Sequence, residues 1–253
     1  MSDQIISVGV LETGRPPPAL AARFPDYPAM VADWLSNLRA TFTAWPVLDG
    51  ALPEHPDDRD LWVITGSPVG AYEDRDWIPP LENFIRRCRD AGRPMAGICF
   101  GHQIIAQALG GAVHKSGRGW GLGVTRYPVK HWPELLGPAP AAFDLQAFHQ
   151  DQVEELPEGA EVLSGTGFCP NAILWYPGFA LTVQGHPEFS PDYSSALLNA
   201  RRGAVFPDDL AERALETQSR PTNADALADI LRRAFFDPTV PTTPTRNRTK
   251  AHP

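Results

Sequence analysis

The sequence has few cysteines and no long apolar run. These two features argue against a disulfide-rich protein and against a membrane-spanning protein. Its three cysteines include no CxxC pair, so a disulfide framework is excluded and a reducing compartment such as the cytoplasm is favoured. No run of about 18 apolar residues is present to cross a membrane, and the first residues lack the pattern of a signal peptide. We therefore expect a soluble, cytoplasmic protein without a membrane partner.

An excess of basic residues is also lacking. The chain carries 30 acidic and 22 basic residues, and the resulting formal net charge of -8 disfavours a nucleic-acid partner. Its 253 residues contain no low-complexity interval in the middle, so we expect a single domain over residues 1–237, with a core over about 5–200. Residues 238–253 carry almost no large packing groups and are predicted to form a disordered tail.

Short apolar runs alternate with helical patterns over the first 111 residues. The strand-like runs lie at 5–11, 41–48, 60–68 and 94–100, and the helical patterns at 29–38, 77–92 and 101–111. This alternation predicts βαβ units, and hence an α/β fold with a mainly parallel sheet and helices on both faces. A proline-rich loop over 12–28 is long enough to form a lid or a specificity element, and a plain surface loop is the alternative.

The pattern changes after residue 111. Five shorter strand-like runs predict a mixed or antiparallel extension of the sheet, at 120–129, 144–150, 160–168, 171–176 and 179–187. Residues 191–237 return to helical patterns, which predicts a set of C-terminal helices. The sequence contains no internal repeat.

The segment GICFGHQ places a thiol between two glycines, where an apolar run ends and a helical pattern begins. Residues 97–101 have the form G-x-C-x-G, the thiol counterpart of a nucleophile elbow. At the amino end of a helix, unpaired N–H groups favour the thiolate of Cys99, and the N–H of Phe100 is placed to receive a developing oxyanion. Taken alone, the motif fits close strand-helix packing about as well as it fits catalysis.

A thiol nucleophile needs a general base, and the chain offers seven histidines. His186 differs from the others because it ends an apolar run and precedes Pro187 and Glu188. The proline makes this turn rigid, so the Glu188 carboxylate can hold the imidazole in one tautomer and stabilise its protonated form. Cys99, His186 and Glu188 are therefore predicted as nucleophile, base and orienting carboxylate. A strand-ending turn with a surface glutamate is the alternative.

Together, the two motifs resemble those of a known family. GICFGHQ followed downstream by GHPE resembles the class I glutamine amidotransferase domain over residues 5–200, in particular its stand-alone, GMP-synthase-like subgroup. The resemblance implies a flavodoxin-like, three-layer sheet. It also implies hydrolysis of the glutamine side-chain amide through a γ-glutamyl thioester on Cys99, without a metal or an organic cofactor.

Further site residues follow from the resemblance alone. Residues 65–68, TGSP, occupy the place of a Gly-Gly-Pro loop in the family, so the N–H of Gly66 is implied as a second oxyanion donor beside that of Phe100. Segments that match the family's glutamine pocket imply five substrate-binding residues, namely Gln103, Asp151, Gln152, Phe168 and Cys169.

Three functions remain open because the chain contains no phosphate-binding loop of a synthase, neither SGGxDS nor GxxxxGK[ST]. The first is a glutaminase that delivers ammonia to a separate synthase or ligase subunit. The second is a free-standing γ-glutamyl peptidase, in which loop 12–28 and the C-terminal helices would shape the leaving-group side. The third is a non-catalytic binding module, which the intact Cys99, His186 and Glu188 disfavour.

Overall fold

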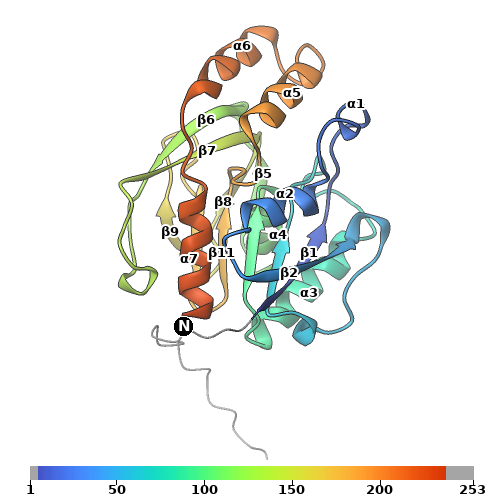
Figure 1. Cartoon of the computed structure of the whole chain (residues 1–253), viewed down its shortest axis with the longest axis vertical. Coiled ribbons are helices and arrows are strands. Elements are labelled where there is room, and N and C mark those ends of the chain that lie inside the picture. The colour runs from blue at the N-terminus through green and yellow to red at the C-terminus, as the bar shows by residue number, and fades with distance from the viewer. Residues whose placement is uncertain (1–4, 238–253) are drawn as a thin grey trace, which may run out of the picture.

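The computed structural model describes residues 5–237, which form a mixed α/β fold around a mainly parallel sheet (Figure 1). The sheet has seven strands in the order β2-β1-β3-β4-β11-β10-β9. Neighbours from β2 to β11 pair in parallel, whereas the pairs β11–β10 and β10–β9 are antiparallel. The strands are β1 (Ile6–Glu12), β2 (Ala40–Pro46), β3 (Leu61–Ile64), β4 (Met95–Ile98), β9 (Glu161–Ser164), β10 (Ile173–Tyr176) and β11 (Ala180–Val183). The predicted fold class is confirmed.

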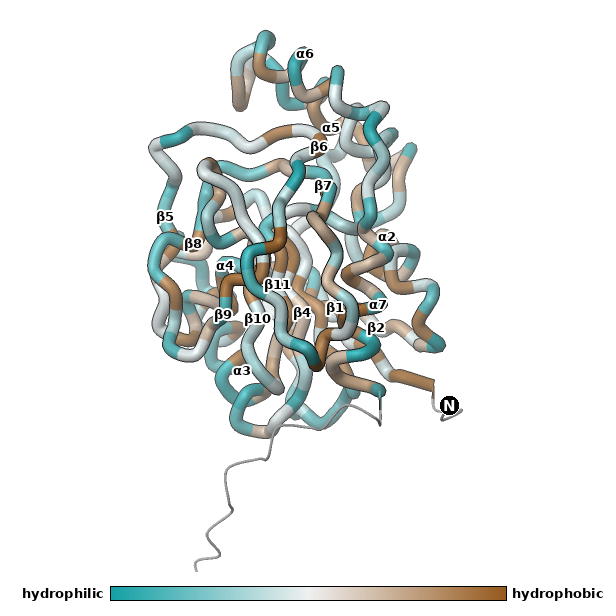
Figure 2. Tube along the Cα trace, turned by 90° about the vertical axis from the view of Figure 1, so that its left-hand side faces the viewer, coloured by the Kyte–Doolittle hydropathy of each residue, from teal (hydrophilic) through white to brown (hydrophobic). Residues whose placement is uncertain are grey.

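Helices cover both faces of the sheet. Helices α2 (Tyr27–Trp34) and α7 (Asp225–Phe236) pack on one face, and α3 (Ile78–Asp90) and α4 (Phe100–Ala108) on the other, each pair over its own apolar cluster. The inner strands β3, β4, β10 and β11 are buried along their whole length, because helices cover them from both sides. They are the hydrophobic centre of the trace in Figure 2.

The remaining elements lie beyond the carboxyl ends of the parallel strands or flank the sheet (Figure 1). Helices α1 (Pro18–Ala21), α5 (Pro191–Arg201) and α6 (Asp208–Glu216) lie there with a ribbon of β6 (Gly121–Pro128) and β7 (Ala142–His149). A second ribbon pairs β5 (Ala112–Lys115) with β8 (Asp151–Glu155). Single 3-10 turns occupy Val47–Asp49, Pro56–Asp58, Glu134–Leu136 and Thr217–Ser219.

Local sequence explains several helix boundaries. Helix α3 has prolines in its first turn, basic residues in its last turn and a buried stripe that includes Leu81, Phe84 and Cys88. The helix that the sequence predicts over 29–38 is α2, which begins earlier, at Tyr27. The side chain of Asp26 caps α2 by accepting a hydrogen bond from the N–H of Ala29. Cys88 is a core residue of α3, as its position on the apolar face predicts.

The strands after residue 111 differ from the prediction in part. Only β9 and β10 extend the sheet with antiparallel pairing, whereas β6 and β7 form a separate ribbon. The short strands β5 and β8 carry polar residues without a clear alternation, so no apolar run indicates them. No helix within residues 5–237 combines the length and the apolar character that crossing a bilayer requires. The predicted tail over 238–253 lies outside the described residues.

Strand β11 lies beside β4 in parallel register, and this pairing brings two distant motifs together. The N–H of Cys99 donates to the carbonyl of Val183 at 2.8 Å, so the chain after β4 and the chain after β11 leave the sheet next to each other. The segment GICFGHQ follows β4, and GHPE follows β11. The carboxyl edge of the sheet therefore juxtaposes Cys99 with His186.

The two glycines around Cys99 are required by close backbone approach. A Cβ on Gly101 would lie 2.3 Å from the carbonyl oxygen of Ile64, and one on Gly97 would lie 2.5 Å from that of Gly101. Both distances are far below any permitted contact, and backbone atoms cannot yield as a flexible side chain would.

Replacing Gly101 by alanine is expected to destabilise the protein. The added methyl group must displace the end of β3, so we expect G101A to lower the free energy of unfolding by about 1–3 kcal/mol in urea denaturation. Gly117 is a matched control, since a Cβ there meets nothing within 4 Å. G117A should remain within about 1 kcal/mol of the wild type. Equal stability of both variants would contradict the packing argument.

Candidate functional site

Cys99 occupies a strained turn between β4 and α4. Its φ of 52° makes it the one non-glycine residue with positive φ among residues 5–237, and its ψ is -100°. It is the N-cap residue of α4, so its thiol lies near the unpaired N–H groups of the first helical turn. Strain of this kind costs roughly 1–3 kcal/mol and persists where the surrounding structure enforces it.

His186 lies beside Cys99 and is held from behind by Glu188. The Nδ1 atom of His186 is 2.8 Å from Oε1 of Glu188, and the two side chains are 5% and 1% exposed. The imidazole also lies close enough to Cys99 for the two side chains to interact electrostatically. Because Nδ1 faces Glu188, Nε2 is the ring nitrogen available to the thiol. The structure thus brings Cys99, His186 and Glu188 into one contiguous chain of polar groups.

Opposing effects act on the protonation of His186. Burial lowers the pKa of the imidazole, but the negative charges of Glu188 and Cys99 raise it, and the net effect is a raised pKa. A raised pKa favours imidazolium, and a positive ring next to sulfur favours thiolate. Burial raises the pKa of Cys88 and of Cys169 to about 12, which disfavours the thiolate of each.

The imidazole of His186 is confined by Phe189 and by the backbone at Gly66. Phe189 stacks on one face, with ring centroids 4.0 Å apart and planes inclined by 9°. On the other side lies Gly66, where a Cβ would come within 2.9 Å of Cε1 of His186. A side chain at position 66 would therefore displace the ring.

The loop that contains Gly66 is fastened to the end of β1. The backbone N–H of Thr13 donates to Oγ1 of Thr65 at 3.0 Å, and the hydroxyl of Thr13 donates to the carbonyl of Thr65 at 2.9 Å. Neither the N–H of Gly66 nor that of Phe100 has a hydrogen-bond acceptor among residues 5–237. Both N–H groups are therefore available to a ligand, and their role as oxyanion donors stays a prediction.

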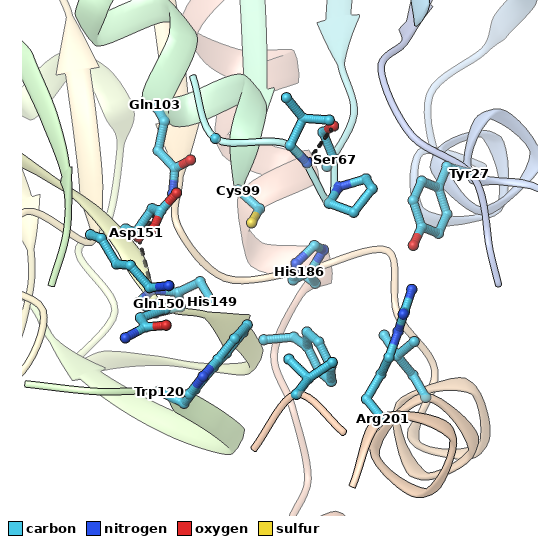
Figure 3. Close-up of a pocket in the computed structure, with 18 of the residues that line it drawn as sticks. Tyr27, Ser67, Cys99, Gln103, Trp120, His149, Gln150, Asp151, His186 and Arg201 are labelled. Atoms are coloured by element: carbon cyan, nitrogen blue, oxygen red, sulfur yellow. Dashed lines mark hydrogen bonds between the residues drawn. The ribbon is translucent and has the colours of Figure 1, made fainter. Parts of the chain in front are cut away.

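A cavity of about 360 Å³ opens in front of Cys99 (Figure 3). Its volume lies within the range of small-molecule sites. Cys99 and His186 lie in the middle of the cavity, Gln103 and Asp151 on one side, and Tyr27 and Arg201 on the other. The reactive groups therefore divide the cavity into two halves.

Asp151 and Gln103 define one half of the cavity. Burial raises the pKa of Asp151, whose carboxylate accepts a hydrogen bond from the hydroxyl of Tyr72. The amide of Gln103 donates to the backbone carbonyl of Asp151 at 2.9 Å. Glu73 and Lys115 line the same half, so this end of the cavity carries two carboxylates and one ammonium group.

Three predicted substrate-binding residues do not line the cavity. Gln152 and Cys169 are buried and are not among the residues that line it. Phe168 lies next to His149, a residue of the cavity wall, and the two ring centroids are 6.1 Å apart. None of these three side chains therefore reaches a ligand in the cavity directly. Within residues 5–237, no group of three or more histidine, cysteine and acidic side chains is arranged to hold a metal ion.

The sequence analysis missed Gln184, which lies within reach of the thiol. Its side-chain amide is 3.7 Å from the sulfur of Cys99, and its oxygen accepts a hydrogen bond from Gln103 at 3.2 Å. The residue is fully buried. Its position two residues before His186, at the end of a strand paired with β4, is the signal that could have indicated it.

The family model for "Glutamine amidotransferase class-I" matches residues 29–200. This match covers more than half of the chain and includes Cys99 and Glu188. The chain therefore belongs to the class I glutamine amidotransferase family, as the motifs predict.

Individual relatives point to more than one activity. A glutamine amidotransferase-like protein of Schizosaccharomyces pombe is 29% identical over 87% of this chain and 95% of its own length. Gamma-glutamyl peptidase 4 of Arabidopsis thaliana is 37% identical over 58% of this chain and 61% of its own length. A crystal structure of a glutamine amidotransferase from Thermotoga maritima aligns with a TM-score of 0.76 at 20% identity, over 92% of this chain and 100% of the other. This last similarity supports the fold alone.

Replacing Glu188 by glutamine is expected to raise the pH at which Cys99 becomes reactive. Without the carboxylate charge, burial lowers the pKa of His186, so the imidazolium that favours the thiolate is lost at lower pH. The rate of alkylation by iodoacetamide, measured against pH, should shift upward by about one pH unit or more in E188Q. Cys88 and Cys169 are buried, so both thiols are shielded from the reagent.

A matched control is available in an exposed pair of the same type. Glu161 lies 3.2 Å from the imidazole of His131 at the surface, far from the cavity. E161Q should leave the alkylation profile unchanged. An unchanged profile in E188Q as well would show that Glu188 does not stabilise the imidazolium.

Proposed function

We propose that the protein hydrolyses γ-glutamyl amide bonds through a thioester on Cys99, with glutamine as the simplest substrate. The observation that carries this proposal is the strained thiol of Cys99, which faces a cavity and contacts a histidine backed by a buried carboxylate. This arrangement is that of an activated nucleophile, its base and an orienting group. Membership of the amidotransferase family supports amide hydrolysis or amide-nitrogen transfer as the reaction class.

In the first half-reaction, the sulfur of Cys99 attacks the side-chain carbonyl carbon of the substrate. The resulting oxyanion receives hydrogen bonds from the N–H groups of Gly66 and Phe100. The carbon–nitrogen bond then breaks, and Nε2 of His186 donates a proton to the departing amine. For glutamine, this amine leaves as ammonia.

In the second half-reaction, water hydrolyses the thioester. His186 removes a proton from the water, the water oxygen attacks the thioester carbon, and the sulfur–carbon bond breaks to release glutamate and the thiolate. Glu188 stabilises the imidazolium that forms in each half. The two half-reactions involve no change of oxidation state, so they need no redox cofactor.

The acidic half of the cavity fits the amino-acid end of a γ-glutamyl group. Asp151 is half-buried and faces the cavity, so its carboxylate can pair with the α-ammonium group of the substrate. Gln103 holds the backbone at Asp151 in place. The γ-amide would then reach Cys99 from this side.

A second candidate function is cleavage of γ-glutamyl peptides without a partner protein. The specific observation in its favour is that the cavity continues past Cys99 and His186, toward Arg201 and Tyr27, where a leaving group larger than ammonia fits. The relative that is named gamma-glutamyl peptidase supports the same reading. Delivery of ammonia to a synthase or ligase subunit is the competing role, and it predicts that such a partner stimulates glutamine hydrolysis.

Replacing Cys99 by serine is expected to abolish hydrolysis. A hydroxyl forms no thiolate, so glutamate release from glutamine or from γ-glutamyl dipeptides should fall by at least about a thousandfold in C99S. Mass spectrometry of the acid-quenched wild type should detect a γ-glutamyl adduct on Cys99 that C99S lacks. C88A is the control, because Cys88 is buried in α3 and should not affect activity. Full activity in C99S would refute the proposed mechanism.

Replacing Asp151 by asparagine is expected to weaken substrate binding more than turnover. Loss of the charge pair with the α-ammonium group should raise KM by roughly tenfold or more and change kcat little. E154Q is the control, because Glu154 is exposed on the same strand and does not line the cavity. A loss confined to kcat would place Asp151 in the chemistry instead of in binding.

A further inference from the structure

We infer that the half of the cavity beyond His186 is a subsite for a leaving amine that carries its own carboxylate, with Arg201 as the residue that binds this carboxylate. The inference rests on the proposed function, since it assumes that Cys99 cleaves γ-glutamyl amides. It adds the group that is recognised on the leaving amine, a carboxylate, and names the residue that binds it.

Three cationic side chains line the cavity, and only Arg201 lies uncompensated on the leaving-group side. Arg15 is neutralised by ion pairs with Glu12 and Asp49. Lys115 is exposed, and its charge acts on Asp151 at the glutamyl end. The guanidinium of Arg201 has no hydrogen-bond or ion-pair partner within residues 5–237.

The position of Arg201 relative to the reactive groups fits this role. Figure 3 places Arg201 and Tyr27 across Cys99 and His186 from Asp151 and Gln103. A γ-glutamyl group bound at Asp151 therefore directs its leaving group toward Arg201. A guanidinium pairs with a carboxylate through parallel hydrogen bonds, which ammonia or a simple alkylamine cannot provide.

One wall of the cavity beside Arg201 is apolar. The wall includes Leu197 of α5 and Phe148 of β7, and Phe148 packs against Trp120 and Phe206 at ring-centroid distances of 6.0 and 5.7 Å. Such a wall suits an apolar side chain on the leaving amino acid. The low polarity nearby also strengthens the attraction between Arg201 and a carboxylate.

Part of the leaving-group side lies outside the residues that the family model matches. The family model covers residues 29–200, so it includes the reactive residues but excludes Tyr27, Arg201 and Val205. The leaving-group side thus combines residues of the family match, such as Leu197 and Phe148, with residues of the flanking segments. The predicted role of loop 12–28 and of the C-terminal helices in shaping this side is consistent with that arrangement.

The test uses two substrates that differ only in the carboxylate. γ-Glutamyl-leucine contains it, and γ-glutamyl-3-methylbutylamide is the same molecule without it. We expect the wild-type chain to cleave the dipeptide with a kcat/KM roughly 10- to 100-fold higher. R201M should remove this preference by slowing dipeptide cleavage alone, and R201K should restore part of it through the retained charge. R213M is the control, since Arg213 is an exposed residue of α6 that does not line the cavity.

The remaining outcomes separate failure of this inference from failure of the proposed function. Equal cleavage of both substrates by the wild type, or an equal loss of both in R201M, overturns the role of Arg201. Hydrolysis of glutamine with no cleavage of either larger amide also overturns the subsite, while the thioester mechanism stands. Absence of both glutamine hydrolysis and a γ-glutamyl adduct on Cys99 contradicts the proposed function itself.

Discussion

The left-handed backbone at Cys99 is the constraint on which the rest of the site depends. With φ at 52°, the chain turns from β4 into α4 within one residue, and the thiol projects beyond the edge of the sheet. Gly97 and Gly101 permit this turn because no Cβ fits at either position. The same geometry places the N–H of Phe100 beside the sulfur, so nucleophile and electrostatic surroundings are created by one local conformation.

The buried pair of His186 and Glu188 is the second requirement, and it would be unfavourable in isolation. Removing an imidazolium and a carboxylate from water is costly unless each charge meets a partner. Here Glu188 lies 2.8 Å from Nδ1, which gives the imidazolium a buried partner of opposite charge. The polar groups of the site are therefore interdependent, and loss of one changes the protonation of the others.

The fold and the chain of Cys99, His186 and Glu188 could be predicted because their signals are local. Glycines around a cysteine and a proline between histidine and glutamate reveal tight turns at strand ends, and parallel strands align these ends at one edge. Arg201 and Thr13 carry no such signal. Each of them gains its environment from a segment distant in sequence, as when Thr13 binds the loop at Thr65. The ribbon of β5 and β8 was missed for a related reason, since its short polar strands are defined by pairing and not by an apolar pattern.

The stacking of Phe189 on His186 restricts the order of events at the site. With one ring face covered at 4.0 Å and Nδ1 held by Glu188, the imidazole cannot rotate, so Nε2 must serve both proton transfers of the proposed mechanism. The departing amine and the attacking water consequently occupy the same place in turn, and the amine must leave before water can enter. Ping-pong kinetics follow from this geometry. An amine that returns before water arrives re-forms an amide, so the proposed mechanism also provides for exchange of one amine for another.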